Sequence, residues 1–109
     1  MTDYTRTRGD TYADIINVKD SSLAVVNITG YSFKLTVDTL ENPTDSATQV
    51  YQLTGSIIDA PNGVVQFSPT ALQADQLGDL YFDIEMTDGA GKITTIDKGS
   101  YTYTQDITK

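Results

Sequence analysis

Three acidic residues near residue 85 are the first candidates for chemistry. Asp83, Glu85 and Asp88 lie close together in the sequence, and paired carboxylates can bind calcium or act as a general acid and base. Residues 80–87 alternate between apolar and polar types, so Asp83 and Glu85 share the polar face of one expected strand. Their spacing differs from that of an EF-hand loop. We therefore interpret them as part of a solvated face.

The composition excludes several other kinds of site. The 109 residues include no cysteine, so no disulfide or thiolate metal site is possible. They include no histidine, the commonest general base and metal ligand. No serine lies in a nucleophile elbow, and residues 88–91 lack the lysine and the following helix of a phosphate-binding loop. We expect a protein that is not an enzyme, with no catalytic residue, cofactor or metal.

The charge of the chain limits its partners. The formal net charge is −8, whereas nucleic acids and anionic membranes attract basic surfaces. We therefore expect no nucleic acid and no membrane among the partners. Residues 1–10 are polar and no stretch approaches the roughly 20 apolar residues of a membrane span, so we expect neither a signal peptide nor a transmembrane segment.

Tyrosines are more numerous than a chain of this size needs. There are seven tyrosines, and Tyr101 and Tyr103 alternate with small polar residues, so both face one side of the last expected strand. Such a pair can complete a hydrophobic core, fill a protein interface or stack on a sugar. On sequence alone these alternatives stay open.

The hydrophobic pattern predicts strands almost throughout. Apolar and polar residues alternate most strictly at 31–38 and 80–87, which places each set of apolar residues on one face. About seven strands separated by turns predict an all-β fold of two antiparallel sheets, a β-sandwich, with a small barrel as the alternative. The remaining β-favouring segments are 11–18, 23–26, 49–59, 64–67, 92–97 and 100–104.

One short connecting helix is expected near residues 69–77. Ser68 suits the N-cap and Pro69 the first turn, and Leu72 and Leu77 are expected to face inward. Gly78 is expected to end the helix.

The length of the chain fits one domain with one core. Residues 1–8 are mostly polar and are expected to form an N-terminal arm. The β-sandwich domain is expected to span residues 9–105, followed by a C-terminal tail at 106–109.

The expected strands and turns carry an ordered series of short motifs. In order, the motifs are Arg8-Gly9-Asp10-Thr11, Ile28-Thr29-Gly30-Tyr31-Ser32-Phe33, Ala60-Pro61-Asn62-Gly63-Val64-Val65-Gln66-Phe67, Leu72 to Leu77, Asp79-Leu80-Tyr81-Phe82-Asp83-Ile84 and Thr87-Asp88-Gly89-Ala90-Gly91-Lys92. This series resembles the small Ig-like β-sandwich modules of tailed-bacteriophage tail and baseplate proteins, and is similar to the N-terminal domain of baseplate upper proteins. The match covers roughly residues 8–104.

The resemblance implies a virion structural protein, made in the host cytoplasm, that belongs to the tail, baseplate or neck. Such a component attaches fibres or neighbouring phage structural proteins through protein–protein contacts, in multiple copies within a symmetric assembly. The N-terminal arm and the last strand then become candidate docking elements. The alternatives are a carbohydrate-binding module for host recognition and a capsid decoration protein. The candidate interface residues are Tyr4, Arg6, Arg8, Tyr101 and Tyr103.

Overall fold

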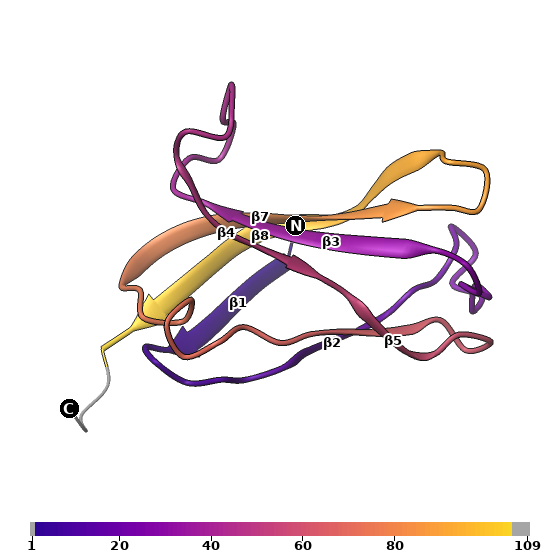
Figure 1. Ribbon diagram of the computed structural model, residues 1–109, viewed down its shortest axis with the longest axis horizontal. Coiled ribbons are helices and arrows are strands. Elements are labelled where there is room, and N and C mark those ends of the chain that lie inside the picture. Colours follow the sequence, from indigo (N-terminus) through magenta and orange to yellow (C-terminus); the bar gives the residue numbers. More distant parts are fainter. Residues whose placement is uncertain (1, 106–109) are drawn as a thin grey trace.

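Two β-sheets make up the computed structural model, which describes residues 2–105 (Figure 1). Within that range the chain forms eight strands and no helix, which confirms the all-β prediction. One sheet has five strands in the order β1-β8-β7-β3-β4 and the other has three in the order β2-β6-β5. The strands are β1 (Thr2–Thr7), β2 (Asp14–Asn17), β3 (Ser32–Asp38), β4 (Gln49–Thr54), β5 (Ser56–Asp59), β6 (Val64–Phe67), β7 (Gly78–Thr87) and β8 (Ile93–Thr104).

The core lies between the two sheets, as in a β-sandwich. On β3, Phe33, Leu35 and Val37 are buried, and the residues between them face outward, as the strict alternation predicts. The same pattern holds on β7. The buried apolar residues are Val18, Ile28, Phe33, Leu35, Val37, Tyr51, Leu53, Val65, Phe67, Ala74, Leu80, Phe82, Ile84, Tyr101 and Tyr103.

Residues 2–7, expected as a polar arm, instead form the edge strand β1. This strand pairs in parallel with β8, from Thr2 opposite Gly99 to Thr7 opposite Thr104, whereas the other strand pairs are antiparallel. Tyr4 packs against the core. The expected tail at 106–109 lies outside the described residues.

Gly55 marks the point at which the chain passes from one sheet to the other. The expected single strand at 49–59 is divided there into β4 of the five-stranded sheet and β5 of the three-stranded sheet (Figure 1). A Cβ atom built on Gly55 would lie 2.7 Å from Val65 Cγ2 and 2.9 Å from Phe33 Cβ. Only a residue without a side chain fits between the two sheets at this crossing.

The helix expected near 69–77 is absent, and this prediction is wrong. Thr70 begins one turn: its Oγ1 accepts from Gln73 N at 3.1 Å, while Gln73 Oε1 accepts from Thr70 N at 2.9 Å. The turn is not continued: a longer helix would pair the Ala74 carbonyl with the N–H of residue 78, but this carbonyl accepts from Gly9 N at 2.9 Å. The buried residue of the segment is Ala74 and not a leucine. Leu72 and Leu77 are exposed rather than inward.

Two further segments differ from expectation. Residues 23–26 form no strand: a single bridge pairs Lys19 with Val25, and Leu23 at the turn has a φ of 62°. The two strands expected at 92–97 and 100–104 are one continuous strand, β8, whose register against β7 shifts at Ile96. A β-bulge at Ile96 therefore keeps the two segments in one strand.

Replacing Gly55 should test the crossing between the sheets. Gly55→Ala should lower the free energy of unfolding by about 1–3 kcal/mol, because the added methyl group overlaps packed side chains of both sheets. Gly89→Ala is the matched control, since a Cβ atom there meets nothing within 4 Å. Urea unfolding of both variants measures the difference. Equal stability of the two would show that the crossing tolerates a side chain.

Candidate functional site

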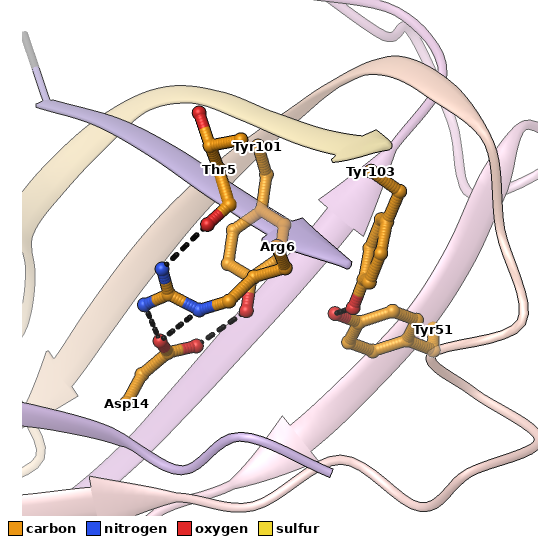
Figure 2. Close-up of polar contacts among 6 residues, drawn as sticks. All are labelled: Thr5, Arg6, Asp14, Tyr51, Tyr101 and Tyr103. Carbon is orange, nitrogen blue, oxygen red and sulfur yellow. Dashed lines mark hydrogen bonds and ion pairs between the residues drawn. The ribbon is translucent and has the colours of Figure 1, made fainter. Parts of the chain in front are cut away.

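A buried ion pair links the two sheets at the β1 edge (Figure 2). Asp14 is the first residue of β2, and its side chain is 1% exposed. Arg6 of β1 donates to Asp14 Oδ1 from both Nε and Nη2, the Nε contact being 3.1 Å. Arg6 Nη1 also donates to the backbone carbonyl of Thr5 at 2.9 Å. The guanidinium therefore ties β1 in one sheet to β2 in the other.

Three tyrosines extend this polar cluster into the core. The Tyr101 hydroxyl donates to Asp14 Oδ2 at 2.5 Å, so both carboxylate oxygens of Asp14 accept hydrogen bonds. The hydroxyls of Tyr51 on β4 and Tyr103 on β8 share a hydrogen bond of 2.8 Å (Figure 2). The phenol rings thus fill apolar space while their hydroxyls find polar partners.

Aromatic rings surround the Arg6 guanidinium. Its Cζ lies 4.2 Å from the ring centroid of Tyr12, 5.0 Å from that of Tyr4 and 5.8 Å from that of Tyr101. A cation near the face of an aromatic ring is attracted by the ring quadrupole. Tyr4 also packs on Phe82, with ring centroids 5.1 Å apart. We call Tyr4, Arg6, Tyr12, Asp14 and Tyr101 the β1 latch, because together they hold the edge strand.

The electrostatics of the cluster keep its tyrosines protonated. Burial, with the hydrogen bond to Asp14, raises the pKa of Tyr101 far above its ordinary value. Burial likewise raises the pKa of Tyr51 and of Tyr103. Burial disfavours the charge on Arg6, but the hydrogen bond with Asp14 and the charge of Asp14, together with Tyr101 and Tyr12, outweigh this effect, so the pKa of Arg6 is raised. The Arg6 guanidinium and the Tyr101 hydroxyl therefore act as fixed donors to Asp14, whereas of Tyr51 and Tyr103 one hydroxyl donates and the other accepts.

The geometry of the cluster supports a structural role. Among the described residues, every buried side-chain nitrogen or oxygen atom has a hydrogen-bond partner. Both oxygens of Asp14 are occupied by Arg6 and Tyr101. The donors and acceptors of the cluster therefore bond to one another, and these bonds hold β1, β2 and β8 together.

The structure brings together four of the five candidate interface residues, but not at an exposed surface. Tyr101 and Tyr103 are 1% and 2% exposed, so they complete the core and a docking partner cannot touch their side chains. Tyr4 and Arg6 are partly buried beside them. Arg8 lies apart, with its Nε 2.6 Å from Asp75 Oδ1 in the connector between β6 and β7.

Sequence reasoning missed Asp14 and Tyr51. Asp14 precedes two isoleucines, and its charge favoured a solvent position in the expected strand. A signal was present: Asp14 and Ile16 share a strand face, and Ile16 packs against the core. A carboxylate on an inward face requires a cation nearby. The pattern leaves open which arginine that is.

The outer face of the five-stranded sheet carries a groove of about 810 Å³. Residues 40–43 and 95–98 lie along it, together with Tyr81 and Asp83. Partial burial, with the neighbouring charge of Glu85, raises the pKa of Asp83, and Lys98 opposes this shift. No group of three or more acidic, histidine or cysteine side chains in the described residues could hold a metal ion. The expected polar face of residues 80–87 therefore borders a groove that several acidic side chains line.

No protein-family model matches the chain, and no curated protein sequence matches it. Within residues 2–105, no helix is long and apolar enough to cross a membrane.

Breaking the ion pair from one side should strongly destabilise the fold. Arg6→Met should cost about 3–5 kcal/mol of unfolding free energy, because it leaves the Asp14 carboxylate buried without its cation. The control Arg8→Met removes an exposed pair and should cost about 1 kcal/mol or less. The double variant Arg6→Met with Asp14→Leu should recover only part of the loss, because the buried Tyr101 hydroxyl then lacks its acceptor. A loss of stability in Arg8→Met as large as that in Arg6→Met would contradict this role.

The buried tyrosines should be visible in an alkaline titration. Because the pKa of Tyr4, Tyr51, Tyr101 and Tyr103 is raised in the folded state, the unfolded chain releases their protons first as pH rises past about 10. Stability should therefore be full below that pH and fall above it. Ultraviolet absorbance should show part of the seven tyrosines ionising in the native protein and the rest only on unfolding. Smooth ionisation of all of them before unfolding would argue against the buried cluster.

Proposed function

We propose that this chain is an Ig-like β-sandwich module and a structural protein of a tailed-bacteriophage virion. In this proposal it is a component of the tail, baseplate or neck and attaches fibres or neighbouring virion proteins through protein–protein contacts. The observation that carries the proposal is the ordered series of motifs between residues 8 and 104.

The places that these motifs occupy in the fold support the proposal. Ala60-Pro61-Asn62-Gly63 joins β5 to β6, and Gly63 has a φ of 71° in close approach to the carbonyl oxygens of Val18 and Val26. In the loop between β7 and β8, Asp88 Oδ1 accepts from the backbone of Ala90 and Lys92, both at 2.9 Å. Two of the motifs therefore form the turns that join neighbouring strands, as expected if the resemblance concerns the module as a whole.

A role in protein–protein contact is supported by the open edges of both sheets. Neither sheet closes on itself in the described residues, so β1 and β4 end one sheet, and β2 and β5 end the other. Edge strands offer backbone donors and acceptors to a partner strand. The polar cluster at the β1 latch is internally satisfied and adds no catalytic alternative.

The carbohydrate-binding alternative loses the feature that suggested it. A sugar would stack on exposed rings, but Tyr51, Tyr101 and Tyr103 are buried. Tyr12 is 59% exposed, and one face of its ring already lies against Arg6. The capsid decoration alternative is separated by the experiment below.

Locating the protein in the purified virion tests the proposal. We expect mass spectrometry of purified particles to detect the chain, and cryo-electron microscopy to place its density at the tail, baseplate or neck. Density on the capsid shell would instead establish the decoration role. Absence of the chain from intact particles that contain all other structural proteins would overturn the proposal.

A further inference from the structure

The edge strand β4 lacks the charges that protect the other edges. Its sequence, Gln-Val-Tyr-Gln-Leu-Thr, has no charged residue, proline or glycine. The opposite edge, β1, carries Asp3 and Arg6, while β2 and β5 are short and contain aspartate. Natural proteins usually protect edges with charge, shortness or bulges, because an unprotected edge pairs with other strands. In β4 a bulge occurs only at Val50, near its start.

The backbone of β4 presents free hydrogen-bonding groups beyond this bulge. From Tyr51 to Thr54 the strand keeps regular antiparallel register with β3. Gly55 N donates to Phe33 O at 2.9 Å, so Gly55 points its backbone groups toward β3. Because this direction alternates along an antiparallel strand, Gln52 and Thr54 point their N–H and C=O groups toward the open edge. Both residues are exposed.

We propose that this edge is the docking site for a second copy of the same chain, with β4 antiparallel to β4 of the copy. The net charge of −8 opposes association of two copies at most surfaces, whereas β4 is uncharged. The antiparallel arrangement also separates the acidic loops that precede β4. Those loops, with Glu41 and Asp45, would lie at opposite ends of the joined edge, but a parallel arrangement would bring them together.

The outward groups fix the register of the pair. Placing Gln52 opposite Thr54 of the copy, and Thr54 opposite its Gln52, lets each pair exchange two backbone hydrogen bonds. Gln52 and Thr54 both lie on the outer face of the sheet, so the outer faces of the two copies lie on the same side of the joined sheet. Leu53 then lies on the two-fold axis that relates the copies. The two five-stranded sheets would then form one continuous sheet. The proposal concerns the isolated chain, so its failure would leave the virion assignment untouched.

Two substitutions at one position separate backbone pairing from side-chain effects. Gln52→Pro removes an N–H that faces the open edge and leaves the bonds to β3 in place. Gln52→Ala keeps that N–H, and both variants lose the bond from Gln52 Nε2 to Thr36 Oγ1. By sedimentation equilibrium up to about 1 mM protein, we expect wild type and Gln52→Ala to dimerise reversibly. We expect Gln52→Pro to weaken association about tenfold or more, with circular dichroism confirming its fold.

Crosslinking provides a second test that needs no proline. The chain has no cysteine, so Gln52→Cys introduces a single reactive thiol. In the proposed register the two copies of residue 52 lie about 8 Å apart, within reach of a short bismaleimide. The matched control is Thr5→Cys, an exposed position on the opposite edge strand, β1. We expect dimers from Gln52→Cys alone. A wild type that stays monomeric while both cysteine variants crosslink equally, or a dimer insensitive to Gln52→Pro, would overturn the proposal.

Discussion

The buried carboxylate of Asp14 is the constraint around which this fold is arranged. An aspartate that is 1% exposed needs a cation and further donors, because an unpaired charge in a protein interior is very costly. Arg6 and Tyr101 meet that need from β1 and β8. The requirement explains why a polar N-terminal segment is ordered as a strand. It also explains why the last strand carries tyrosines, which can fill a core and still offer a hydroxyl group.

Sequence-based prediction succeeded where the residues of one strand alone show which of its faces is buried. The alternation at 31–38 and 80–87 predicted β3 and β7 and their buried faces. In a half-buried strand every second side chain faces the core, so apolar residues recur at every second position. The turn at 60–63 has a local cause of the same kind, since Gly63 readily takes the positive φ observed there. In these segments local preference and tertiary packing agree.

Prediction failed where the outcome depended on residues distant in the sequence. Residues 2–7 look polar, and only the strand β8 and the carboxylate of Asp14 make them a strand. The segment 69–77 has acceptable helical residues, but its backbone is fixed by Gly9, far away in sequence. The burial of two candidate interface residues was missed for a related reason. Alternation shows that Tyr101 and Tyr103 share a face, but it does not show whether that face is inside or outside.

The parallel pairing of β1 with β8 has a consequence for how the chain folds during synthesis. Among the described strands, β1 is made first and β8, its hydrogen-bonding partner, is made last. Contacts between such distant segments close late, because the entropy of a long loop must be overcome first. The nascent chain therefore carries β1 unpaired, and Asp14 without Arg6 held in place, until β8 has emerged. The module completes its fold only after synthesis of β8, and a ribosome that stalls before β8 holds a chain whose five-stranded sheet lacks β8 and the pairing of β1.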